Sequence, residues 1–145
     1  HLKTGLTLAV HTGNNSVAAK KQMELLTEFN IDFNNWIWTH ANKFEDINVL
    51  INAAKKGAWI SLDGVNDKNI DEYIAKLKRF KKENLLGNVL ISHDGNSLPN
   101  GRKIRSYDAI MIHLILNLKT NGFSDDDIQQ LTVINPKLAF RIKHI

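Results

Sequence analysis

The stretch Asn88-Val89-Leu90-Ile91-Ser92-His93-Asp94-Gly95 combines a short apolar run with a carboxylate that follows it. Glycines stand on both sides of the run, at Gly87 and Gly95, which is typical of a parallel strand covered on both faces. A carboxylate after such a strand lies at the carboxyl edge of a sheet, where α/β proteins hold their functional groups. The stretch therefore predicts an α/β fold, with Asp94 as a candidate functional residue.

Histidines follow two further strand-like runs in the same way. His11 comes directly after Leu6–Val10, and His40 comes directly after Trp36–Thr39. Because the carboxyl ends of parallel strands meet at one edge, we expect these two histidines and Asp94 to point at one place.

The whole chain alternates between strand-like and helix-like patterns. The polar ends of the apolar runs fall at residues 11, 40, 63 and 94, close to the roughly 30-residue spacing of βαβ units. Such alternation favours a parallel sheet with right-handed crossovers. Four units form either a small open sheet or half of an eight-stranded barrel, which typically needs about 250 residues. Strands are predicted at 6–11, 36–39, 58–62 and 89–92, and helices at about 16–30, 44–56, 70–83, 107–121 and 124–131.

Helix ends carry more detailed signals. Ser124 and Asp127 have the spacing of a capping box, and Asn135-Pro136 predicts the start of a separate last helix. Asn15 or Ser16 is the candidate N-cap of the first helix. The residues expected on the buried side of that helix are Val17, Ala18, Met23, Leu25, Leu26 and Phe29.

Composition narrows the class of protein. The chain has 145 residues, a size normal for one domain, and its 43% hydrophobic residues can form a sizeable core. No apolar run approaches the roughly 18 to 20 residues needed to span a membrane, so no membrane partner is expected. The absence of cysteine excludes disulfides and thiolate metal sites. No signal peptide is visible, so a cytoplasmic location is expected; a secreted or periplasmic one stays open because the native N-terminus is not visible.

The net charge of +4 raises the question of a nucleic-acid partner. The densest basic run, Lys76–Lys82, contains Leu77 and Phe80, which continue an apolar stripe from Tyr73. Lysines around such a stripe are typical of the solvated face of a helix. We therefore expect no nucleic-acid partner.

An ordered set of stretches resembles the C-terminal half of the phosphotriesterase family, in the amidohydrolase superfamily. The resemblance covers nearly the whole chain and implies one domain, 1–145, that forms strands five to eight of a (β/α)8 TIM barrel, with the upstream half absent. The matching stretches are Thr4-Gly5-Leu6, Val10-His11-Thr12, Thr39-His40, Leu90-Ile91-Ser92-His93-Asp94 and Leu131-Thr132-Val133-Ile134-Asn135-Pro136.

The resemblance also implies a binuclear metal site, with zinc as the expected divalent ion. His11 and His40 resemble the ligands of one metal, and Asp94 resembles the ligand of the other that also handles the proton of the bridging hydroxide. Imidazole and carboxylate groups suit zinc-like ions, which activate water near neutral pH. The family's other ligands, a His-x-His pair and a carboxylated lysine, would lie upstream of this chain, so we expect two metals in the complete protein and a weak or absent ion here.

Three further polar residues, Asp63, His93 and Arg102, are candidates for other roles. In well-studied members a proton-relay histidine follows the seventh-strand aspartate, but Gly64 follows Asp63 here, which argues against true phosphotriesterase activity. Asp63 and Arg102 are expected either to contact the substrate or to serve only in their loops. His93 should point to the face opposite Asp94 and be structural.

Three functions remain open. The first is part of a binuclear hydrolase, such as a lactonase, that acts on small lactones, esters or phosphoesters. The second is a catalytically inactive half-barrel or structural module, and the third is a related metal-dependent deoxyribonuclease. This chain alone is expected to be inactive. Its open sheet edges predict a homodimer or pairing with the missing N-terminal half.

Overall fold

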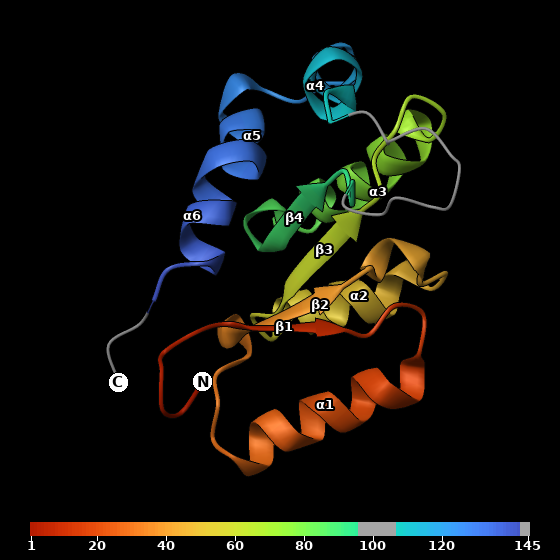
Figure 1. Cartoon of the computed structure of the whole chain (residues 1–145). Coiled ribbons are helices and arrows are strands. Elements are labelled where there is room, and N and C mark those ends of the chain that lie inside the picture. The colour runs from red at the N-terminus through yellow and green to blue at the C-terminus, as the bar shows by residue number, and fades with distance from the viewer. Residues whose placement is uncertain (96–106, 143–145) are drawn as a thin grey trace, which may run out of the picture.

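The computed structural model describes residues 1–95 and 107–142 (Figure 1). The predicted substrate residue Arg102 lies outside the described residues. Four parallel strands form one sheet in the order β1-β2-β3-β4. The chain thus has the predicted α/β fold with sequential parallel units. The strands are β1 (Leu8–His11), β2 (Trp36–Thr39), β3 (Trp59–Asp63) and β4 (Val89–Ser92).

Helices connect the strands as expected for successive βα units (Figure 1). Short 3-10 turns precede β2 and β4 and follow β2, at Phe33–Asn35, Leu86–Asn88 and Ala41–Lys43. The three connecting helices are α1 (Ser16–Glu28), α2 (Ile47–Lys55) and α3 (Ile70–Lys82). After β4, a π-helical turn at Ile110–Leu114 leads into α4 (Ile115–Thr120), and α5 (Asp125–Gln129) leads through π-helical Gln130–Ile134 into α6 (Asn135–Ala139).

The two faces of the sheet have different surroundings, because alternate strand residues point in opposite directions. Val10, Trp38 and Ile60 are neighbours in the strand register and pack into the main core with the buried residues of α1, α2 and α3. The other face corresponds to the interior of a complete barrel. It carries a smaller apolar cluster of Ile37, Trp59, Leu90 and Ala139.

The basic stretch of α3 has the predicted apolar stripe, because Tyr73, Leu77 and Phe80 are buried. Lys78 and Lys82 are exposed, whereas Arg79 and Lys81 are half-buried. Lys81 forms an ion pair with Asp127, which attaches α3 to the C-terminal segment.

The first helix differs from the prediction. Asn15 caps it, accepting a hydrogen bond from the main-chain N–H of Ala18. Only Ala19 and Leu26 are buried along its length, and Phe29 is 54% exposed. The expected buried side was therefore wrong for Val17, Leu25 and Phe29, which are exposed, whereas Leu26 is buried and Met23 packs against the core. The physical reason is position: α1 lies beside the edge strand β1, which covers only a narrow stripe of the helix (Figure 1).

The C-terminal helix also differs from the prediction. The capping box of Ser124 and Asp127 is confirmed, but the helix that it starts continues past residue 131 to Ala139. The widened π-helical turn before Pro136 accommodates a residue that lacks an N–H and crowds the carbonyl four residues earlier. Asn135 is not a cap: its amide group donates to the main-chain oxygens of Leu86 and Val89, both at 2.7 Å. Among the described residues, no helix has the length and apolar character of a membrane span.

Candidate functional site

The two histidines predicted from the sequence lie together at the carboxyl edge of the sheet. His11 ends β1, and His40 follows β2, whose Thr39 is paired with His11 in the register. Their ring centroids are 4.3 Å apart, with an interplanar angle of 77°. Parallel pairing of two apolar strands thus places two imidazole rings in edge-to-face contact.

His40 has a left-handed backbone, with φ of 59°, which side-chain-bearing residues rarely adopt. Such conformations cost on the order of 1 to 3 kcal/mol and persist where the surroundings fix them. The main-chain N–H of His40 donates to Oδ2 of Asp63 at 2.7 Å, and this bond holds the turn that follows β2.

The carboxylate of Asp63 is buried at the end of β3 and joins three strand ends. Oδ1 accepts hydrogen bonds from the hydroxyls of Ser61 and Ser92, both at 2.7 Å. Oδ2 accepts the main-chain N–H of His40 and lies 3.4 Å from Nδ1 of the same residue. The predicted contact of Asp63 with substrate stays a prediction; in this structure both oxygens contact protein groups.

The main chain of Asp63 is fixed as well. Its N–H donates to the side-chain oxygen of Asn42 at 3.1 Å, and its carbonyl oxygen accepts the hydroxyl of Tyr73. Lys76 donates to the carbonyl oxygen of Asn42 at 2.7 Å. Two side chains of helix α3 therefore hold the main chain around the end of β3.

Asp94 follows β4 and also has a positive φ, of 48°. It borders a polar cavity of about 270 Å³ together with His40, Asp63, Asn42 and Asn66. The structure thus brings Asp94 and His40 to the same cavity, at the edge where both were expected. Tyr73, Lys43, Gly64, Asn69 and Glu72 complete its lining.

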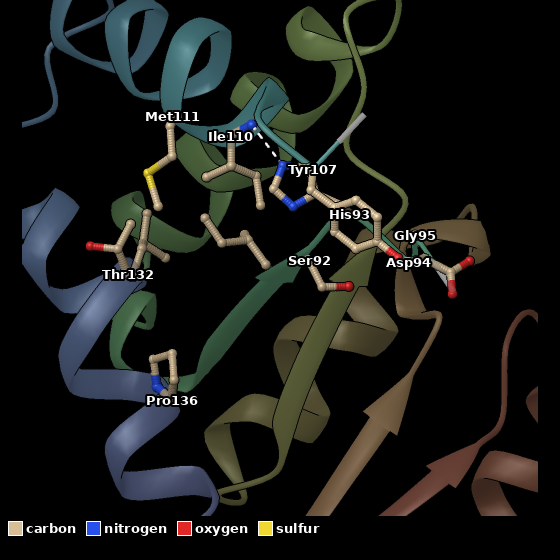
Figure 2. A pocket seen from close by; sticks show the side chains of 11 residues that line it. Ser92, His93, Asp94, Gly95, Tyr107, Ile110, Met111, Thr132 and Pro136 are labelled. Atoms are coloured by element: carbon tan, nitrogen blue, oxygen red, sulfur yellow. Dashed lines mark hydrogen bonds between the residues drawn. The ribbon is translucent and has the colours of Figure 1, made fainter. Parts of the chain in front are cut away.

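His93 points to a different place from Asp94. Figure 2 shows its ring reaching the main chain of Ile110, whose N–H donates to Nε2 at 3.0 Å. Burial lowers the pKa of His93 below its ordinary 6.5, although the carboxylate of Asp108 acts to raise it. The contact fits the structural role expected for His93. His93 borders an apolar cavity of about 390 Å³ together with Tyr107 and Met111.

The donor set suits a zinc-type ion only in part. Two imidazole nitrogens from adjacent rings match the ligands that zinc prefers. Within residues 1–95 and 107–142, no group of three His, Cys, Asp or Glu side chains lies close enough to hold a metal ion. His11, His40 and Asp94 therefore do not form a three-ligand cluster here, and a complete site needs further donors.

Several residues of the site were missed by the sequence reasoning. Ser61 lies two positions before Asp63 on one strand, so the two side chains share a face, and this signal was available. The contacts of Ser92, Asn42 and Tyr73 join separate parts of the chain and have no comparable local signal.

Four parallel βα units with polar groups at their carboxyl ends form an α/β fold of the kind found in half of a TIM barrel. The family model that matches is the phosphotriesterase family, over residues 1–140. The chain belongs to the phosphotriesterase family, as its resemblance implied.

Individual proteins similar to this chain include members of the same family. An N-acetyltaurine hydrolase of Dictyostelium discoideum is 25% identical over 97% of this chain and 42% of the relative. The phosphotriesterase homology protein of Escherichia coli is 26% identical over 97% of this chain and 50% of the relative. A lactonase from Listeria monocytogenes has a similar structure, with a TM-score of 0.82 and 21% identity, over 99% of this chain and 47% of that one. The chain thus spans about half the length of the curated relatives it matches.

Proposed function

We propose that this chain carries one half of the active site of a metal-dependent hydrolase that acts on small lactones, esters or phosphoesters. The observation that supports this most is the edge-to-face pair of His11 and His40 at adjacent strand ends. Membership of the phosphotriesterase family supports the class of reaction. The relatives named as a hydrolase and a lactonase support cleavage of an acyl bond in a small molecule.

Each residue has a proposed role. His11 and His40 hold a divalent ion, which we propose to be zinc, through ring nitrogens. When bound, such an ion activates water and polarises the bond under attack. Asp94 takes up a proton at a carboxylate oxygen, as general bases do, and contributes to a second metal. These roles require that residues outside this chain supply the remaining ligands.

The polar cavity between His40 and Asp94 supports a substrate with hydrogen-bonding groups. Asn42 and Asn66 border it with amide groups, and Lys43 adds a cationic side chain at its rim. A small ester or lactone with polar substituents fits this lining better than a purely apolar one.

An inactive half-barrel is the second candidate for the chain taken alone. It is favoured by the absence of a three-ligand group among the residues that the structure describes. The two proposals are compatible, because the first concerns the complete protein and the second this chain by itself. The family match supports the phosphotriesterase branch over the related deoxyribonucleases.

The proposal is tested by Asp94→Asn in the complete protein, which has the rest of the barrel. Asparagine keeps the shape of the side chain but cannot take up the proton. We expect turnover of a lactone and ester panel to fall by about 100- to 10,000-fold. Asp67→Asn, at an exposed loop position, is the matched control and should keep full activity. Rates near those of the parent in the Asp94→Asn variant would refute the assignment.

A further inference from the structure

Hydrogen bonds from the protein occupy most of the acceptor capacity of the Asp63 carboxylate. An ionised carboxylate has about four lone-pair positions. The hydroxyls of Ser61 and Ser92 and the main-chain N–H of His40 occupy three of them, each at 2.7 Å. Oδ2 also lies 3.4 Å from Nδ1 of His40. The imidazole of His40 is therefore the next contact of this carboxylate after its three hydrogen bonds.

We propose that Asp63 is a positioning residue that holds the ring of His40 with its proton on Nδ1, so that the lone pair of Nε2 is left for a metal ion. This role rests on the proposed function, because it concerns the same metal site. In metal centres, a carboxylate on the second ring nitrogen fixes the tautomer and the orientation of the histidine and raises its basicity as a ligand.

The same carboxylate fixes the main chain of His40. Its bond to the N–H of His40 holds the left-handed turn, and its contact with Nδ1 acts on the ring. Asp63 thus contacts both the main chain and the ring of His40. His11 lies within β1, where the paired strand β2 holds its main chain. Of the two histidines, His40 is therefore the one whose placement depends on a buried acid.

The distance between Nδ1 and Oδ2 is longer than the 2.7 to 3.2 Å of an ordinary N–H···O hydrogen bond. Hydrogen bonds in functional sites are often long without a ligand and tighten when it binds. Asp63 is held in place by the two serines, and His40 by its main chain. Our proposal therefore requires that the ring, and not either backbone, moves to shorten this contact when a metal binds.

The test is the ring tautomer of His40 in the metal-free chain, measured by nitrogen-15 NMR at alkaline pH, where imidazole is neutral. We expect the proton on Nδ1 in the parent chain. Asp63→Asn removes the negative charge, and its neutral amide oxygen is a weaker acceptor for both the main-chain N–H and the ring Nδ1 of His40. The fraction of His40 rings with the proton on Nδ1 should therefore fall, and the affinity for zinc should fall by about 10- to 100-fold.

The matched control is Tyr73→Phe, which removes a hydrogen bond to the main-chain oxygen of Asp63 and keeps the carboxylate in the chain. This variant should keep the tautomer and the zinc affinity of the parent chain. A purely structural role for Asp63 predicts that both variants leave the tautomer unchanged.

A proton on Nε2 in the parent chain, or a tautomer unaffected by Asp63→Asn, would overturn the proposal. If the Asp63→Asn variant does not fold, the parent chain alone tests the proposal: a proton on Nδ1 of His40 supports it, and a proton on Nε2 overturns it. Should zinc leave the rings of His11 and His40 unperturbed while Asp63 still controls the tautomer, the metal site is rejected and the positioning of His40 by Asp63 is supported.

Discussion

Ser92 donates a 2.7 Å hydrogen bond from its hydroxyl to Oδ1 of Asp63, and this bond joins the ends of β3 and β4. Asp63 and Ser92 are partners in the strand register, so the bond adds a side-chain link to the main-chain pairing. Asp94 lies two residues further along the chain. The carboxylate of Asp63 thus holds the end of the strand that leads into Asp94.

Ser92→Ala should lower the free energy of unfolding by about 1.5 to 3 kcal/mol, the usual contribution of a hydrogen bond to a charged group. The reason is that the buried Oδ1 of Asp63 loses one of its two hydroxyl donors. Urea denaturation measures the change. The matched control is Ser16→Ala at an exposed position of α1, which should stay within about 0.5 kcal/mol of the parent. Equal stabilities for the two variants would contradict the importance of the link.

The acid sensitivity of the C-terminal segment should depend on Asp127. Burial acts to raise the pKa of this carboxyl, but hydrogen bonds from Lys81 and Ser124 outweigh it and hold the pKa below its ordinary 3.8. Since the folded pKa is the lower one, the unfolded chain binds more protons between the two values. The contribution of Asp127 is therefore fully present above its ordinary pKa and is lost as the pH falls through the folded pKa.

Asp127→Asn should accordingly be less stable than the parent near neutral pH, by about 0.5 to 1.5 kcal/mol, the usual net contribution of one hydrogen bond. Urea midpoints measured from pH 7 down to pH 3 should converge toward the acid end. Asp126→Asn, at the exposed neighbouring position, serves as the control. A difference between Asp127→Asn and the parent that does not narrow with falling pH would contradict the assignment.

Most of the fold could be predicted from the sequence because buried parallel strands leave a clear local signal. Each apolar run is followed at once by a polar residue, and this pattern located all four strands and the His11–His40 pair. The last helix could not be predicted correctly. Asn135-Pro136 has the local form of a helix start, but the distant carbonyls of Leu86 and Val89 take the amide of Asn135 as a buried donor.

The role of Asp63 lay outside local reasoning for a similar reason. Apart from Ser61 on its own strand, its partners are His40, which follows β2, and Ser92 of β4, and both are distant in the sequence. A carboxylate after a strand is equally compatible with a substrate contact, a loop cap or a support for another side chain. Only the assembled sheet shows which groups surround it.

The edges of the sheet predict association of the chain. Among the described residues, β1 and β4 each pair with one neighbouring strand only. Unpaired edges are templates for further strands, and closed twofold dimers are the commonest oligomers. Burial of several hundred Å² of apolar surface at about 25 cal/mol per Å² would stabilise such a pair by several kcal/mol. We expect a dimer of this chain by sedimentation at micromolar concentration.

Ala9→Lys places a charge at an exposed position of the edge strand β1 and should convert the dimer to a monomer. Asn14→Lys adds the same charge at an exposed loop position and should leave the dimer intact. A parent chain that sediments as a stable monomer would show that its edges are already covered.

We propose that this chain holds an incomplete metal site built on His11 and His40, and zinc analysis after dialysis is the decisive experiment. We expect at most one weakly held zinc per chain, which is lost in both His11→Ala and His40→Ala. His113→Ala, on the exposed side of the helix after β4, should bind zinc as the parent does. Two zinc ions retained per chain, or a single ion that survives loss of either His11 or His40, would contradict the account.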